Sequence, residues 1–267
     1  MKKYLTYFRI RFIGGLQYRA AALAGISTQF AWGFLYILLY SAFCRADPEA
    51  FPMEFSQLAS YVWLQQAFLA LFMNWYYDSD ILGMISDGSI AYELVRPLDI
   101  YVLWFTKTVA ARVSRAVLRC FPILIVASFL PDPYGLTLPP TPLHAVLFVL
   151  TMVLGMFVVT AFSMLIYCAC FYTVNATGVR MVAQSVADFL SGSELPLPFM
   201  PAAMRRVIEM TPFGVMQNLP FRIYSGSITG NEMWFLTGMQ LFWTVVLIGG
   251  GWLWMRAALK KVVVQGG

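Results

Sequence analysis

Two carboxylates, Asp188 and Glu194, stand in or beside a long apolar stretch and are candidates for proton chemistry. An ionisable group inside such a stretch is a functional candidate by default, because placing it there costs free energy. Six residues separate the two, which turns one about 240° from the other on a helix, so they share no face. An ion pair with Arg180, Arg119 or a loop arginine explains these acids equally well, and Glu194 fits an interface exposed to water. We derive no proton-coupled mechanism from them.

The sequence lacks the residue clusters of a catalyst. His144 is its one histidine, and no HExxH, GxSxG or matched pair of nucleophile and base is present. The phosphate-binding pattern GxxxxGK[ST] is also absent, so this chain alone is not expected to hydrolyse ATP. Four cysteines lie in or beside apolar stretches, without metal-site spacing: Cys44, Cys120, Cys168 and Cys170. We expect no enzyme and no cofactor or metal bound by this chain.

The composition is that of an integral membrane protein. Of 267 residues, 60% are hydrophobic and 12% charged, whereas soluble domains carry about 25% charged residues. At about 20 residues per crossing, the apolar material suffices for about six helices. We predict an all-α integral membrane protein with six transmembrane helices, forming a single transmembrane domain over residues 1–267.

Five spans follow from apolar runs at residues 20–43, 55–76, 143–172, 181–194 and 232–255. The remaining one lies within residues 99–130, and counting back about 20 residues from Leu130 starts the crossing near Ala111. The stretch before it is expected to follow the inner interface. Arg119 falls deep on this count, and an arginine that snorkels to the interface is favoured over a substrate contact.

Two further segments flank or interrupt the spans. Residues 1–19 are basic, with Leu5, Phe8, Phe12 and Leu16 at helical spacing, which predicts an interfacial helix on the inner leaflet. Residues 195–231 are apolar but divided by prolines, which predicts an outer re-entrant segment between spans five and six, with a two-turn helix over 202–210. Candidate pathway or gate residues are Arg119, Asp188, Glu194, Pro196, Pro198, Phe199, Pro212 and Phe213.

The distribution of basic residues predicts the orientation. Of the 18 lysines and arginines, 14 fall in segments assigned to the inside and 4 outside, namely Arg45, Arg205, Arg206 and Arg222. Positively charged loops stay in the cytoplasm, so both termini are expected there. The sequence pI near 9.0 therefore reflects topology and not nucleic-acid binding.

Residues 77–98 form a polar stretch between the second and third spans, on the predicted inside. Asp78 and Asp80 place acids in a first helical turn, and Gly88 stands where the helix would stop. Pro97 disfavours helix at Arg96, so the chain breaks before the next helix. The apolar side consists of Ile81, Leu82, Met84 and Ile85. Such a helix offers a handle to a soluble partner, and a capped connecting loop is the alternative.

Four stretches in this order carry a resemblance over nearly the whole chain: GSIAYELVRPLDIY, FYTVNATGV, LSGSELPLPFMP and TPFGVMQNLPFRIYSG. With the basic N-terminus, they resemble the membrane permease subunit of a type-2 ABC transporter. The similarity is to the bacterial six-span efflux permeases that work in pairs with a separate ATPase.

The resemblance implies a cytoplasmic coupling helix within residues 77–98 that docks on the ABC ATP-binding subunit, where ATP and Mg bind. Coupling residues by this resemblance are Asp78, Asp80, Ile81, Leu82, Met84, Ile85, Gly88, Glu93, Arg96 and Pro97. It also implies a second permease (homodimer or related heterodimer), a path along spans one, two and five, and the bacterial cytoplasmic membrane.

By the same resemblance the protein is an exporter of a hydrophobic or amphipathic substrate, such as a drug, a peptide or a lipid-like molecule. The alternatives are a six-span channel, a secondary transporter or a membrane assembly factor, none of which needs an ATPase. A secondary transporter usually shows repeated halves, and the sequence has no convincing internal repeat.

Overall fold

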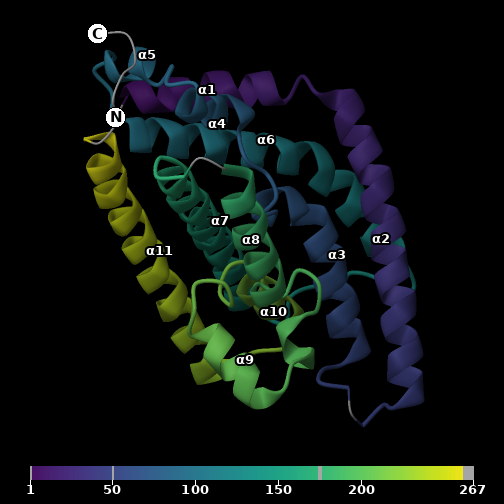
Figure 1. Ribbon diagram of the computed structural model, residues 1–267. Coiled ribbons are helices and arrows are strands. Elements are labelled where there is room, and N and C mark those ends of the chain that lie inside the picture. Colours follow the sequence, from purple (N-terminus) through teal and green to yellow (C-terminus); the bar gives the residue numbers. More distant parts are fainter. Residues whose placement is uncertain (1, 50, 174–175, 261–267) are drawn as a thin grey trace.

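The computed structural model describes residues 2–49, 51–173 and 176–260, and the regular elements in these ranges are helical (Figure 1). They are α1 Lys2–Gly15, α2 Arg19–Ala46, α3 Phe55–Phe72, α4 Ser79–Ser86, α5 Ala91–Leu94, α6 Ile100–Phe129, α7 Pro142–Cys170, α8 Ala176–Leu190, α9 Ala202–Glu209, α10 Asn218–Ser225 and α11 Gly230–Leu259. Residues 174–175 of the FYTVNATGV stretch, and Lys261 of the inside count, lie outside the described residues.

Three of the described helices, α2, α7 and α11, are long and apolar enough to cross a membrane. They support the predicted all-helical membrane protein, while the number of six spans stays a prediction. α8 has 15 residues, about 22 Å of helix against a hydrocarbon core of about 30 Å. α6 has 30 residues but carries basic residues along its middle, from Lys107 to Arg119.

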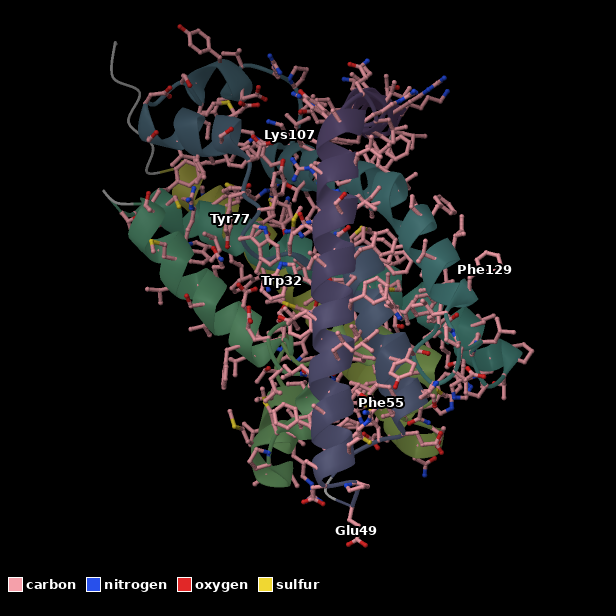
Figure 2. The ribbon with its side chains drawn as sticks, turned by 90° about the vertical axis from the view of Figure 1, so that its right-hand side faces the viewer. Trp32, Glu49, Phe55, Tyr77, Lys107 and Phe129 are labelled. Carbon is pink, nitrogen blue, oxygen red and sulfur yellow. The ribbon has the colours of Figure 1, made fainter. Side chains whose placement is uncertain are left out.

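The elements that connect the long helices gather at two opposite ends of the molecule. α1, α4, α5 and the C-terminal end of α11 lie at one end, and α9 lies at the other (Figure 1). We call these the α4 end and the α9 end. Figure 2 shows α2 running between them, with Lys107 near the α4 end and Glu49 at the far end of α2. The predicted interfacial and coupling helices are therefore on one side of the bundle.

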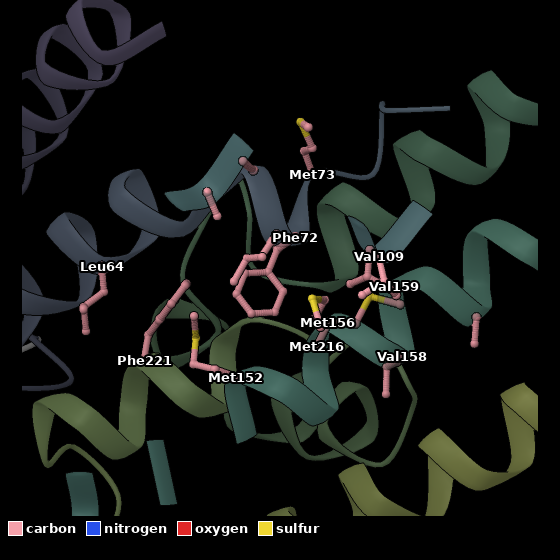
Figure 3. Packing of buried hydrophobic residues seen from close by; sticks show 14 of the residues in the cluster. Leu64, Phe72, Met73, Val109, Met152, Met156, Val158, Val159, Met216 and Phe221 are labelled. Carbon is pink, nitrogen blue, oxygen red and sulfur yellow. The ribbon is translucent and has the colours of Figure 1, made fainter. Parts of the chain in front are cut away.

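α3 is the central helix of the bundle. Its Tyr61, Trp63 and Phe72 are almost completely buried, because α2, α6, α7 and α10 surround it. Phe221 of α10 meets the rings of Tyr61 and Phe72 edge-on, with centroids 5.5 and 5.6 Å apart. Methionines fill the space beside these rings, as Figure 3 shows for Met152, Met156 and Met216. A mostly apolar core of this kind surrounds the few buried charges described below.

α1 lies on the surface and packs along α6. The backbone N–H of Asp99 donates a hydrogen bond to the Tyr4 hydroxyl (2.9 Å), and Gly15 lets the chain approach Ser114 closely. α1 thus ends at Gly15, within the expected segment 1–19. α6 is one continuous helix from Ile100 to Phe129. The structure therefore has no helix break near Ala111, where the crossing is expected to start.

The segment 195–231 contains α9, close to the predicted helix over 202–210, and α10, most of which is buried. Gln240 of α11 anchors this segment: its Nε2 donates to the carbonyls of Thr151 (3.0 Å) and Val215 (2.7 Å). The Val215 carbonyl lies outside the helices, and this buried amide gives it a hydrogen-bond partner. Whether the segment re-enters the membrane stays a prediction.

Gly155 of α7 is expected to tolerate no side chain. A methyl group on Gly155 would overlap the Met216 carbonyl oxygen, a backbone atom that cannot move alone, and would also touch Gln240 and Phe72. We predict that Gly155→Ala lowers the free energy of unfolding by about 1–3 kcal/mol. The matched control is Gly249→Ala in α11, where the added methyl meets nothing and helix propensity favours alanine. Unfolding in mixed micelles of both variants measures the difference, and equal stability would contradict the packing described here.

Candidate functional site

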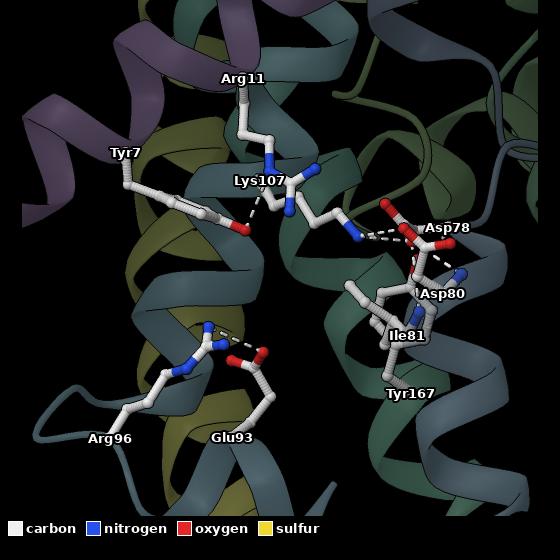
Figure 4. Close-up of polar contacts among 9 residues, drawn as sticks. All are labelled: Tyr7, Arg11, Asp78, Asp80, Ile81, Glu93, Arg96, Lys107 and Tyr167. Carbon is white, nitrogen blue, oxygen red and sulfur yellow. Dashed lines mark hydrogen bonds and ion pairs between the residues drawn. The ribbon is translucent and has the colours of Figure 1, made fainter. Parts of the chain in front are cut away.

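Asp78 begins α4 and attaches it to α7. Its Oδ1 accepts hydrogen bonds from the backbone N–H groups of Asp80 (3.0 Å) and Ile81 (3.2 Å), which makes it an N-cap. The backbone N–H of Asp78 donates to the hydroxyl of Tyr167 on α7 (2.8 Å), as Figure 4 shows. α4 therefore lies where the sequence predicts a short helix, and its start is held against a long helix.

Lys107 of α6 holds the same turn from the other side. Its Nζ lies 2.8 Å from Asp78 Oδ1 and 3.0 Å from Asp80 Oδ2 (Figure 4). The Lys107 side chain is 9% exposed, so its ammonium needs these acids to offset the loss of water. The sequence shows Lys107 only as one of a row of basic residues, because its acidic partners are 27 and 29 positions away.

The apolar side of α4 faces the protein's own core. Ile81 is fully buried in a cluster with Trp104 and Tyr167, and Leu82, Met84 and Ile85 pack against the same cluster. This corrects the expectation that the apolar side of the helix faces a partner protein, because Ile81 is not accessible to one. The physical reason is that an eight-residue helix is unstable alone and gains its stability by packing its apolar side.

The chain after α4 carries exposed apolar residues. Gly88 has φ +76°, a conformation that suits glycine, and it follows the end of α4 as predicted. Exposed Arg96 forms an ion pair with the largely buried Glu93 (3.0 Å), and Pro97 lies in the break before α6. Tyr92 is 76% exposed and Val95 82% exposed. Neither side chain is covered by an element of the described residues.

The pKa of Asp80 provides a test of the Lys107 contact. The hydrogen bond from Lys107, and then its charge, lower the pKa of the Asp80 carboxyl. A lowered pKa adds stability above the unfolded-state value of about 4, and this contribution is lost as pH falls through the folded-state pKa. The effect is small, because the Asp80 side chain is 72% exposed. We predict that Asp80→Asn melts at a temperature that changes less with pH below about 5 than that of the wild type. Identical slopes would contradict the contact.

Arg112 of α6 supports the chain that leads into α4, and the sequence showed it only as another basic residue. It is fully buried, and its guanidinium donates to the carbonyls of Leu71 (2.9 Å) and Met73 (2.9 Å) and to Ser163 Oγ (3.2 Å). The two carbonyls belong to the end of α3, where helix carbonyls lack intrahelical partners. The path from α3 to α4 is thus fastened to α6 and α7 at both Arg112 and Lys107.

The candidate pathway residues do not form one site. Arg119 lies near Gly25, at the start of α2, whereas Phe199 stacks on Tyr40 near the other end of that helix. Phe213 meets the ring of Phe162 on α7 (5.3 Å). These positions are separate packing contacts in this structure.

The two acids of the first hypothesis differ in their surroundings. The Asp188 carboxylate accepts a hydrogen bond from Asn74 Nδ2 (3.0 Å), and in the described part of the chain it forms no ion pair with Arg119 or Arg180. Glu194 is exposed, as the outer-interface interpretation expects. Pro196 and Pro198 beside it are buried, and Pro212 is half-buried. Among residues 2–49, 51–173 and 176–260, no cluster of His, Cys, Asp or Glu could hold a metal ion.

Comparison with known families gives a match over most of the chain. A family model described as "ABC-2 family transporter protein" matches residues 25–266. No curated protein matches the sequence.

Proposed function

The chain belongs to the ABC-2 family of transporter proteins, and we propose that it is the membrane subunit of an ATP-driven exporter whose ATP-binding subunit is a separate chain. A type-2 ABC permease without a phosphate-binding loop needs such a partner. The observation that carries the proposal is the α4–α5 segment, which is fastened to α6 and α7 but leaves apolar side chains exposed at its tip.

The docking surface consists of Tyr92, Leu94 and Val95, which we call the α5 patch. Exposed aromatic and apolar residues on a firmly held element are typical anchors of protein interfaces. Asp78, Asp80, Lys107 and Arg112 then act as positioning residues, because they connect the patch to α3, α6 and α7. When the ATP-binding subunits close, they move the patch, and the ion pairs and hydrogen bonds pass this movement to the long helices.

The α4 end is assigned to the cytoplasm of a bacterial cell, so that α1 lies on the inner leaflet of the cytoplasmic membrane. The 14 to 4 division of the 18 basic residues supports this orientation. In this arrangement α2, α3, α6, α7, α8 and α11 provide the six spans. The segment with α9 and α10 is the outer gate.

A second permease, identical or related, completes the pathway by facing α2 and α8, whereas α3 is buried within this chain. α8 supports this assignment, because its apolar residues Met181, Val182 and Phe189 are exposed on the single chain. The substrate is assigned to the hydrophobic or amphipathic class, on the apolar character of these helices and on the family.

Purification of the tagged chain in several mild detergents tests the proposed function. We expect an ATP-binding subunit to co-purify, identified by mass spectrometry, and the complex to hydrolyse ATP. A variant of that subunit without its catalytic base serves as the control for contaminating ATPases. Recovery of the chain without any ATP-binding subunit in all detergents would contradict the proposal and favour a channel or an assembly factor.

A further inference from the structure

A cavity of about 630 Å³ lies between α1, the beginning of α2 and the middle of α6. It is separate from the α5 patch, but it shares Asp78, Asp80 and Lys107 with the contacts that position that patch. Its lining contains four basic residues: Arg11, Lys107, Arg115 and Arg119. The acids Asp78 and Asp80 also reach it. Lys107 forms ion pairs with both acids, so its positive charge is already neutralised.

The three arginines have no carboxylate of their own. In the ranges that the structure describes, none of them forms an ion pair, although Arg11 acts on Asp80 from longer range. Arg115 lies over the ring of Tyr76 (3.6 Å to the centroid), and Arg11 lies over Tyr7. The Nε of Arg119 is buried and finds no acceptor among the residues that the structure describes. A partly enclosed site with three such guanidinium groups attracts an anion, and arginine matches the geometry of phosphate.

The side chains at the rim of the cavity indicate which kind of anion it binds. Ile10 and Tyr18 line it and are 62% and 71% exposed, and Leu5 and Ile13 extend the apolar surface of α1. A soluble phosphate makes no use of these side chains, whereas the acyl chains of a lipid cover them. Basic pockets between helices on the cytoplasmic side suit lipid head groups.

We propose that this cavity binds the phosphate of an anionic phospholipid of the inner leaflet, held by Arg11, Arg115 and Arg119. The inference rests on the inner-leaflet position that the proposed function gives to α1. The lipid fills the gap between α1 and α6 and joins the interfacial helix to the basic side of α6. Gly25 matters here, because a methyl group on it would overlap the Arg119 guanidinium.

Native mass spectrometry of the purified full-length chain tests the site without any ATP-binding subunit. The probes are phosphatidylglycerol and phosphatidylcholine with the same acyl chains. We expect the wild type to retain phosphatidylglycerol preferentially. Arg115→Gln and Arg119→Gln are each expected to weaken this retention about fivefold, the effect of one basic residue near a lipid surface. Melting temperatures establish that the variants are folded.

Two variants separate a built site from general charge. Arg9→Gln removes a charge from the exposed surface of α1 outside the cavity, and it should leave the preference near that of the wild type. Gly25→Ala keeps every charge but displaces Arg119, and it should weaken retention of phosphatidylglycerol.

Three results would overturn the proposal. They are equal retention of both lipids by the wild type, an equal loss in Arg9→Gln and Arg119→Gln, and displacement of the lipid by equimolar inorganic phosphate. Since the assay contains no ATP-binding subunit, failure here leaves the proposed function standing, and failure of the co-purification leaves the lipid site standing.

Discussion

Arg112→Met is expected to lower the free energy of unfolding by about 3–5 kcal/mol. The variant leaves the carbonyls of Leu71 and Met73 and the hydroxyl of Ser163 without their donor in a fully buried position. Each buried acceptor without a partner costs about 1–3 kcal/mol. Methionine removes the cost of burying a charge, but this gain offsets only part of the loss. The end of α3 should also loosen, and with it the position of α4.

Unfolding of the purified chain in mixed micelles measures this loss. Arg96→Met is the control, because the Arg96 side chain is 56% exposed, and its partner Glu93 is 15% exposed. We expect this variant to lose about 1 kcal/mol, well below the loss in Arg112→Met. Arg112→Lys should lie between wild type and Arg112→Met, since one ammonium cannot reproduce the planar fork of the guanidinium. Equal stability of Arg112→Met and Arg96→Met would contradict the role given to Arg112.

Arg222→Met is expected to be similarly costly, by about 3–5 kcal/mol, because it leaves a buried carboxylate unpaired. Arg222 of α10 is nearly fully buried and forms ion pairs with Glu209 of α9 and with Glu232 of α11 (2.9 Å). It thereby joins three elements at the α9 end. The Glu209 side chain is 10% exposed and that of Glu232 is 52% exposed.

The difference in exposure between the two acids supplies the control. Glu232→Gln should cost about 1 kcal/mol or less, whereas Arg222→Met should destabilise the chain strongly. In the double variant Arg222→Met, Glu209→Gln much of the loss should be recovered, since no buried charge remains alone. Unfolding of the three variants under the same conditions gives the comparison, and no recovery in the double variant would contradict the explanation by an unpaired charge.

Local signals made α4 predictable. Asp78 before an apolar stretch and Gly88 after it are a cap and a stop that act within a few residues, and the structure contains a helix between them. The burial of Ile81 inside this chain was not predictable, because the side that a short amphipathic helix buries depends on what packs against it. Trp104 and Tyr167, which cover Ile81, come from α6 and α7.

The charged contacts of the site were hidden for the same reason. Lys107 and Arg112 appear in the sequence as part of a basic row, and nothing in their spacing distinguishes them from Arg115 or Arg119. Folding gives Lys107 two acids and gives Arg112 two carbonyls of α3, at separations of 27 to 41 residues. Arg222, counted as an outer basic residue, is likewise a buried centre of ion pairs. Composition shows how many charges a membrane protein has, and tertiary contacts decide which of them are buried.

The double variant Tyr92→Asp, Val95→Asp tests the central claim, that the α4–α5 segment transmits ATP hydrolysis by a separate subunit. Both side chains are exposed, so the variant should fold and melt like the wild type. Leu138→Asp, an equally exposed apolar position between α6 and α7, is the control. We expect the double variant to lose co-purified ATP-binding subunit and its ATPase activity by about tenfold or more, and the control to keep both. An ATP-binding subunit that stays bound and active in the double variant would contradict the account.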